Sequence, residues 1–516
     1  MNKFLKLMAL CLIGLQSTQA QQLKGYCGTT LEDNGMIKER MLANRAAWEG
    51  KLFTRSGAIT YIPINLWLMA KDDGSGRLLP SKITEFMCCL NNSVYKDMDF
   101  QFYVNKVIFE NRSYVFDDPS STLGEAYIRS YMLGNKNAIN IFIANIARAS
   151  DPGVLAFYNP SGDYIVTNKA YINSDCSTLA HEIGHYFSLA HTFFGWENTD
   201  YYDVTSNCTK PTPKIVSYAG GSVLVEYVDR NKAGTGGKKL CEQAADGFCD
   251  TPADYNLGFG YNGRGCNYDS CTVDPDGVKL DPLEVNYMSY FLDCINSFTD
   301  DQKAAILKDY LSSARNYLRR TPEYTAKPQI TESINYIKPT STNLPFGYDE
   351  VVFDWDDVPE ATHYIFELGE NTGFSINPKF YILTKSDTVL RNLIKNKTYY
   401  WRVTAYNSNS FCIVSKLITF KNPNWTVASE NIEDTQTNSY IVQNGLSSMK
   451  WFIQNKANEE LYYRVMDAQG KIVTGGTLNI LNGQTIVELN HLKAGVYFYS
   501  LLNTKQQMNT GKFFIY

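Results

Sequence analysis

Three of the five histidines in the chain lie within one short run, from His181 to His191. His181 and His185 are four residues apart, so on a helix both imidazoles leave the same face and can bind one metal ion. Glu182 follows the first of them, where a carboxylate can act as a base. His191 would be the third ligand and would leave the fourth position to water, as in catalytic zinc sites. The run predicts a helix, a turn and one bound Zn²⁺; the alternative is a core helix whose histidines bind nothing.

Length and composition describe a large globular protein. At 516 residues the chain is too long for one ordinary domain, and two to four domains are expected. The net charge of -5 offers no basic surface for nucleic acid. The 36 tyrosines, together with frequent Thr, Val and Asn, favour strand-rich extracellular modules.

The first 20 residues have the pattern of a signal peptide. Lys3 and Lys6 precede an apolar run over 7–15, and small residues lead to Ala20. That run is too short to cross a membrane, and no later segment approaches eighteen apolar residues. Cys11 lies inside the run, which leaves lipidation as an alternative. We therefore expect an exported protein without a membrane span, either secreted or held at the cell surface.

The number of cysteines adds a constraint. The chain has 12, and loss of Cys11 with the signal peptide leaves 11. Most should form disulfides in an oxidising compartment. Because 11 is odd, at least one thiol stays unpaired or pairs with another chain.

The pattern along the chain predicts several segments. Residues 21–50 are polar and partly helical, as expected of a pro-segment. Residues 51–320 alternate strands and helices, with a long stretch from 198 to 281 that has little helical period and is cross-linked by cysteines. In this part we expect Asp175 to cap the histidine helix, strands at 58–68, 100–109 and 139–145, an edge strand at 164–167, and helices at 80–95 and 300–318.

Beyond residue 330 the chain reads as all-β. Residues 330–421 form short alternating strands typical of a β-sandwich. The spacing of Trp355, Pro359, Ala361 and Tyr364, with the strand 400–403, resembles a fibronectin type III module. Residues 422–438 read as a linker, and 439–516 again predict strands.

The last segment carries three short motifs, at 467–471, 492–497 and 512–516. They resemble the C-terminal sorting domain of type IX secretion cargo. The resemblance implies the type IX secretion machinery as a partner and export across the outer membrane of a Gram-negative bacterium. The alternative is one more adhesive β-module.

Four blocks in order carry a second resemblance, which covers about 25–318. They are the histidine run continued to Phe193, the loop 246–253, the segment 286–290 with Met288, and the segment 293–302. Together they resemble the pappalysin family of metzincin zinc endopeptidases. The implied architecture is multidomain: an α+β metzincin-type zincin catalytic domain at 51–320, followed by all-β sandwich modules.

The resemblance also implies roles for single residues. His181, His185 and His191 would bind zinc, and Glu182 would be the general base and then the general acid in peptide-bond hydrolysis. Met288 would form the hydrophobic floor of the site. Tyr290 would steady the tetrahedral intermediate through its phenol, with ordinary turn packing as the alternative.

Further implied features surround this site. Asp246 and Thr251 match calcium-binding positions, although acidic loop residues are often only solvated. Cys241 would pair with Cys271 and Cys266 with Cys294, while Cys208 and Cys249 could pair with each other. Asp293 would read an arginine after the scissile bond.

Cys27 stands in the segment 26–29, which resembles the pro-segment cysteine of the family. Its thiolate would occupy the fourth zinc position and keep a zymogen latent, which would account for the odd thiol. The alternative is a plain disulfide with Cys88, Cys89 or Cys176.

Ser188 departs from the family pattern. A glycine usually stands three residues before the third histidine, where the chain takes a left-handed conformation that costs other residues about 1 kcal/mol. We expect a slightly altered turn and a working site. The sequence therefore predicts a secreted zinc endopeptidase acting on proteins or peptides. Its rival is an inactive zincin scaffold that binds a surface through its β-modules, against which Glu182 argues.

Overall fold

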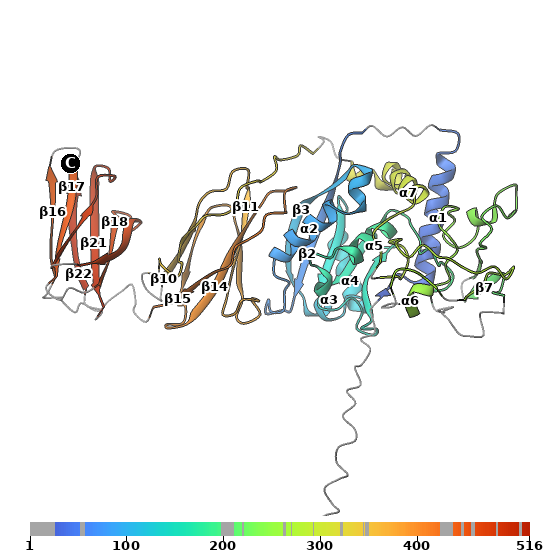
Figure 1. The fold of residues 1–516 in the computed structure, drawn as a ribbon, viewed down its shortest axis with the longest axis horizontal. Helices are drawn as coiled ribbons and strands as arrows, with labels where there is room; N and C mark the ends of the chain where they lie inside the picture. Colours follow the sequence, from blue (N-terminus) through green and yellow to red (C-terminus); the bar gives the residue numbers. More distant parts are fainter. Residues whose placement is uncertain are drawn as a thin grey trace, which may run out of the picture. The chain divides into compact units, whose positions relative to one another are not determined.

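The computed structural model describes most of the chain, as two compact units, Met1–Lys327 and Pro328–Tyr516 (Figure 1). Each unit is treated by itself. The described residues are 26–51, 57–197, 211–218, 221–261, 265–269, 271–292, 294–319, 324–343, 345, 350–423, 437–444, 448–455, 460–480, 483–504 and 508–515. The predicted signal peptide at 1–20 and most of the predicted linker at 422–438 lie outside these residues.

A six-stranded sheet forms the centre of the first unit, in the order β1-β5-β6-β4-β2-β3. Strand β5 runs antiparallel to β6, while β6, β4, β2 and β3 are mutually parallel. The short β1 pairs with the free edge of β5 in parallel. The strands are β1 (Tyr26–Cys27), β2 (Thr60–Ala70), β3 (Phe100–Asn111), β4 (Ile139–Ala144), β5 (Val154–Asn159) and β6 (Tyr164–Asn168).

The prediction of an edge strand at 164–167 is wrong, because β6 lies between β5 and β4. Its first four residues are all buried. A strand whose two faces are both buried shows a continuous apolar run, as residues 164–166 do. No strand is predicted at 154–159, where β5 lies, and without β5 one edge of β6 has no neighbouring strand.

Helices pack around this sheet and against one another. Helix α5 (Ser177–Tyr186), which carries the histidines, contacts β5 and β6, and α1 (Leu31–Ala47) contacts α7 (Asp300–Leu311). Both α1 and α7 begin with a capping box, at Thr30 and Thr299. The other described α-helices are α2 (Ser81–Asn91), α3 (Ser113–Asp117), α4 (Thr122–Met132) and α6 (Leu257–Tyr261). Short 3₁₀ helices are η1 (Val94–Met98), η2 (Lys169–Tyr171), η4 (Leu240–Glu242) and η5 (Ser313–Leu318), and a small hairpin joins β7 (Ile215–Tyr218) to β8 (Gly221–Leu224).

A buried charged network joins distant parts of this unit. The Arg315 side chain is 1% exposed and pairs with Asp163 at 2.6 Å and with Asp309 at 3.0 Å. Arg40 of α1 contacts the other oxygen of Asp309 at 3.2 Å. Burial alone would raise the pKa of Asp163, but Arg315 and the Tyr317 hydroxyl together hold that pKa well below its ordinary value.

We expect Asp163→Asn to lower the free energy of unfolding by about 3–5 kcal/mol at pH 7, because it leaves Arg315 buried with one fewer counter-charge. Since the folded-state pKa of Asp163 is depressed, its contribution is complete above the unfolded pKa of about 4 and is lost as the pH falls. The difference from wild type should therefore shrink towards pH 3. This difference in the free energy of unfolding is measured by urea titration, with near-ultraviolet circular dichroism as the signal. Glu85→Gln, in a surface pair with Lys82, is the control and should cost under about 1 kcal/mol.

Disulfides cross-link the first unit. Cys266 and Cys294 form the bond that the family resemblance implies, and Cys89 pairs with Cys176. Cys241 pairs with Cys249, so the expected Cys241–Cys271 bond is wrong, as is a Cys208–Cys249 bond. Cys249 is only eight residues from Cys241 in the sequence. Closing this short loop costs less chain entropy than closing the longer loop to Cys271. Cys271 is also disulfide-bonded.

The second unit is all-β, as predicted. Its first module packs a three-stranded sheet, β13-β10-β9, and a four-stranded sheet, β12-β11-β14-β15, around a core with Trp355 and Trp401. This is the predicted β-sandwich. Its strands are β9 (Tyr336–Lys338), β10 (Glu350–Trp355), β11 (His363–Gly369), β12 (Lys379–Leu383), β13 (Asp387–Arg391), β14 (Thr398–Tyr406) and β15 (Ile418–Lys421).

The C-terminal module also consists of two sheets, β16-β17-β20 and β19-β18-β21-β22, with Trp451 in its core. Its strands are β16 (Thr437–Asn444), β17 (Ser448–Asn455), β18 (Glu460–Asp467), β19 (Ile472–Asn479), β20 (Gln484–Glu488), β21 (Gly495–Asn503) and β22 (Met508–Ile515). Across the described parts of both units, none of the helices has the length and apolar character needed to span a membrane.

Candidate metal centre

Helix α5 presents two of the three histidines towards one point. His181 and His185 are 4% and 0% exposed, and their rings are 4.7 Å apart. Cys176 caps the helix without a side-chain hydrogen bond, so the expected cap at Asp175 is displaced by one residue. Asp175 instead accepts a hydrogen bond from the Ser177 N–H, at 3.1 Å.

The turn after α5 brings the third histidine back to the first two. Ser188 has φ +66°, in the left-handed region. The Ser188 N–H donates to the His185 carbonyl and the Leu189 N–H to the Gly184 carbonyl, both at 3.0 Å. This pair of bonds defines a Schellman motif, which usually takes glycine at the left-handed position. The expected alteration of the turn is not seen, because the serine adopts the glycine conformation.

Four ligand atoms converge where the histidines meet. The side chains of Cys27, His181, His185 and His191 each offer one atom, and all four atoms lie within 4.8 Å of one another. The Cys27 Sγ is 3.5 Å from the His185 Nε2, which is 3.2 Å from the His191 Nε2. All four residues are buried. Three imidazoles and a thiol at these separations form a set of donors that suits zinc.

Main-chain carbonyls orient two of the rings. The Nδ1 of His181 contacts the Tyr287 carbonyl, and the Nδ1 of His185 lies 2.7 Å from the Leu189 carbonyl. A ring that donates from Nδ1 leaves Nε2 free to bind a metal. Within the described structure, the His181 Nε2 has no hydrogen-bond partner, so the donor set fits a metal ion.

Two residues beside His191 were missed by the sequence analysis. Glu197 places an oxygen 3.4 Å from the His191 Nδ1, and its other oxygen accepts from the Gly195 N–H at 2.8 Å. Asn34 of α1 accepts from the His191 N–H at 3.0 Å, and its amide nitrogen lies 3.1 Å from the Nδ1. Glu197 follows His191 by six residues and could have been noticed; Asn34 had no signal in the sequence.

Glu182 lies beside the candidate metal ligands and is fully buried. Burial raises the pKa of its carboxyl to about 8. Burial also raises the pKa of the Cys27 thiol, and the neighbouring Glu182 carboxylate adds to that increase. Cys27 is a free cysteine rather than a partner of Cys88, Cys89 or Cys176.

Met288 packs directly against helix α5, which carries His181 and His185. It is fully buried, and a Cβ placed on Gly184 of α5 would lie 2.6 Å from its sulfur. Gly184 therefore lets the methionine approach the backbone between the two helical histidines. The position of Met288 below the site is predicted from the sequence, whereas the requirement for glycine at position 184 is not.

Tyr290 borders the same point from the other side. Its ring lies 5.1 Å from that of His191, and its hydroxyl donates to the Cys27 carbonyl at 2.9 Å. Nearby, the buried Asp254 accepts from the hydroxyls of Thr192 and Ser289, each at 2.8 Å. Asp254 thus ties the residue after His191 to the residue after Met288.

The predicted calcium residues meet in a second buried cluster. An Asp246 oxygen accepts from the Phe248 N–H at 2.9 Å and from the Thr251 hydroxyl at 3.2 Å. The second Asp246 oxygen and one Glu226 oxygen have no hydrogen-bond partner in the described structure. Burial raises the pKa of Asp246, and the Glu226 carboxylate raises it further. Asp293, the predicted specificity residue, lies outside the described residues.

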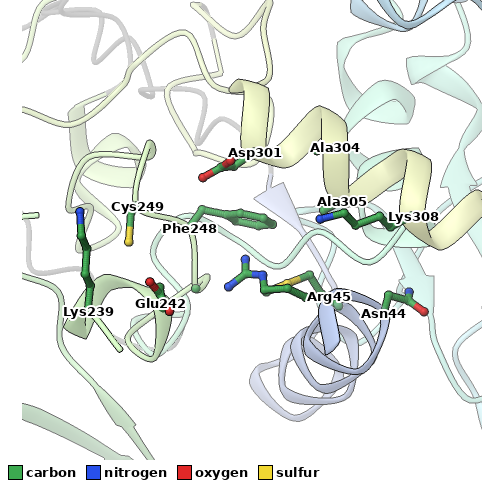
Figure 2. Close-up of a pocket in the computed structure, with 12 residues that line it drawn as sticks. Asn44, Arg45, Lys239, Glu242, Phe248, Cys249, Asp301, Ala304, Ala305 and Lys308 are labelled. Atoms are coloured by element: carbon green, nitrogen blue, oxygen red, sulfur yellow. The ribbon is translucent and has the colours of Figure 1, made fainter. Parts of the chain in front are cut away.

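A cavity of about 400 Å³ opens elsewhere, between α1, α7 and the loop closed by Cys241–Cys249 (Figure 2). Arg45 of α1 stacks at 5.2 Å over the Phe248 ring inside it. It contains cationic and anionic side chains, and its lining includes none of the candidate zinc or calcium ligands named above. It is bordered by Met41, Asn44, Arg45, Lys239, Glu242, Gly247, Phe248, Cys249, Asp301, Ala304, Ala305 and Lys308.

We expect Ser188→Gly to raise the free energy of unfolding by about 1 kcal/mol, because glycine lacks the Cβ that disfavours φ +66°. Urea unfolding measures the change. Ser188→Ala is the matched control, since it removes the hydroxyl and keeps the Cβ. Equal stability of the glycine and alanine variants would show that the turn is not strained.

Comparison with known proteins assigns a family to the C-terminal module. The secretion system C-terminal sorting domain family matches residues 448–516. The protein is therefore exported by type IX secretion machinery and is secreted or lies at the cell surface of a Gram-negative bacterium. No curated protein matches the sequence. The crystal structure of chicken CNTN1 FN1-FN3 domains matches with 14% identity over 37% of this chain and 68% of that chain, at a TM-score of 0.18.

Proposed function

We propose that the first unit is a zinc endopeptidase of the pappalysin type, with a metzincin fold, and that it is made in a latent form. The observation that carries the proposal is the convergence of His181, His185, His191 and Cys27 within 4.8 Å. Glu182 lies next to them, and Met288 packs below them. In the second unit, the seven-stranded sandwich supports a fibronectin type III module.

The arrangement supports hydrolysis of a peptide bond. Zinc held by the three imidazoles would make a water nucleophilic near neutral pH and polarise the scissile carbonyl. The Glu182 carboxylate accepts the proton of the attacking water and returns it to the leaving amine. The Tyr290 hydroxyl, released from the Cys27 carbonyl, donates to the oxygen that gains negative charge.

The N-terminal segment supports latency. Strand β1 pairs with the free edge of β5, and it places the Cys27 thiol among the metal ligands. The same strand covers Glu182 and engages Tyr290. An extended substrate that needs this edge and the metal must displace β1, which the Cys27 and Tyr26 side chains help to anchor.

The cluster of Asp246, Thr251 and Glu226 supports a structural calcium ion. Calcium prefers carboxylate, hydroxyl and carbonyl oxygens, and these three side chains provide the first two kinds. Arg230 already pairs with Glu226 at 2.7 Å, and a bound cation would offset the repulsion that remains between the two buried carboxylates. Glu226 would thus join the two residues that the sequence indicated.

We expect the activated protein to cleave peptides only with metal bound and Glu182 intact. A zinc chelator and Glu182→Ala should each reduce kcat/KM by at least about 1000-fold, because each removes the means of activating water. Readdition of Zn²⁺ should restore the chelated protein. Hydrolysis of a quenched-fluorescence peptide library measures this, with Asp117→Ala, which removes an exposed carboxylate of α3, as an unaffected control. Equal background cleavage in every sample would exclude a peptidase and favour the rival, a binding scaffold.

We expect Cys27 to be a ligand in the intact chain. Co²⁺ substituted for zinc should show a thiolate-to-metal charge-transfer band in the near ultraviolet, and Cys27→Ser should lack it. Cys27→Ser should also cleave peptides at least about ten-fold faster than the intact wild type, since water gains the fourth position. Mass spectrometry confirms that each chain is uncut. A charge-transfer band that survives in Cys27→Ser would contradict the switch.

A further inference from the structure

Tyr26, next to the candidate metal ligand Cys27, occupies a defined side-chain contact site. Its ring lies edge-on to Phe259 at 5.5 Å and 6.5 Å from the Tyr290 ring. Its hydroxyl donates to one carboxylate oxygen of Asp151. Two aromatic rings thus border the Tyr26 ring, and a carboxylate accepts a hydrogen bond from the Tyr26 hydroxyl.

The main chain around Asp151 is adapted to this contact. The Gly153 N–H donates to the other Asp151 oxygen at 3.2 Å, which orients the carboxylate. A Cβ on Gly153 would lie 3.1 Å from the Tyr26 ring, so a larger residue there would press on it. A tyrosine phenol carries its proton at neutral pH, so Tyr26 is the donor in this contact and the carboxylate is the acceptor.

The Tyr26 contact site, defined by Asp151, Gly153, Phe259 and Tyr290, lies along the edge of the sheet that leads to the metal. The Tyr26 N–H donates to the Gly153 carbonyl at 2.9 Å, and Tyr26 pairs with Val154 at the start of β5. The next residue in β1 places its sulfur 3.5 Å from the His185 Nε2. A chain that replaces β1 on β5 would therefore carry a side chain past this site as it reaches the metal.

We infer that the Tyr26 contact site is a substrate subsite that selects tyrosine at one position near the cleaved bond. The inference rests on the proposed peptidase function. In the latent chain, Tyr26 occupies the subsite in place of that substrate residue. Asp151 is the binding residue that distinguishes tyrosine from phenylalanine, because only the phenol can donate to it.

The test compares pairs of quenched peptides that differ only by Tyr or Phe at each position around the cut. The enzyme is the full chain with Tyr26→Ala and Cys27→Ala, which vacates the subsite and the fourth metal position. At one position we expect kcat/KM to be about ten-fold higher for Tyr than for Phe, as for one hydrogen bond to a charged group. Asp151→Ala should bring this ratio near one, because it removes the acceptor of the phenol.

Two further variants separate recognition from damage to the fold. Asp151→Asn keeps an oxygen acceptor without the charge, so its Tyr-to-Phe ratio should lie between those of the parent and Asp151→Ala. Asp117→Ala removes an exposed carboxylate of α3 and should leave the ratio unchanged. Circular dichroism confirms that each variant is folded.

The possible results are distinct. Chelator-sensitive cleavage with equal rates for Tyr and Phe would overturn the subsite and leave the proposed function in place. A Tyr preference that survives Asp151→Ala would overturn the role of Asp151. No chelator-sensitive cleavage of any peptide would overturn the proposed function, and the subsite with it.

Discussion

The end of helix α5 is the constraint on which the candidate metal centre depends. The helix can present only His181 and His185, so the third imidazole must return from beyond it. The chain reverses at Ser188, whose left-handed conformation closes the Schellman motif. Two guanidinium groups, from the half-buried Arg40 and the buried Arg315, donate to the Tyr186 carbonyl at this end. Cations at this end donate to carbonyls that have no partner within the helix, and they interact favourably with the negative end of the helix dipole.

The N-terminal segment both covers this site and supports it. Cys27 lies against His185, Asn34 bonds to His191, and Arg40 holds the last turn of α5. Removal of the segment would therefore change more than access to the metal. Asp309 would keep only Arg315 of its two arginine partners, and His191 would keep Glu197. A segment that reads as a polar pro-segment is thus packed into the unit that it covers.

Local patterns predicted much of the fold. The helix of the histidine run, the parallel strands β2, β3 and β4, and the sandwich strands around Trp355 and Trp401 follow from periodicity within short windows. The errors arose where distant segments meet. Strand β6 is interior because β5 covers it, and β1 is a two-residue strand whose partner lies far along the chain. The Cys241 pairing depended on which loop returns to it.

The sequence by itself determined the candidate ligands on α5, the methionine below them and the sorting domain at 448–516, because each is written in contiguous residues. Only the tertiary structure decided that Cys27 stays unpaired beside His185, that Glu197 and Asn34 reach His191, and that Asp151 receives Tyr26. These contacts join residues that are separate in the chain. Their partners are set by how the sheet edge, α1 and the loops pack, which no local spacing encodes.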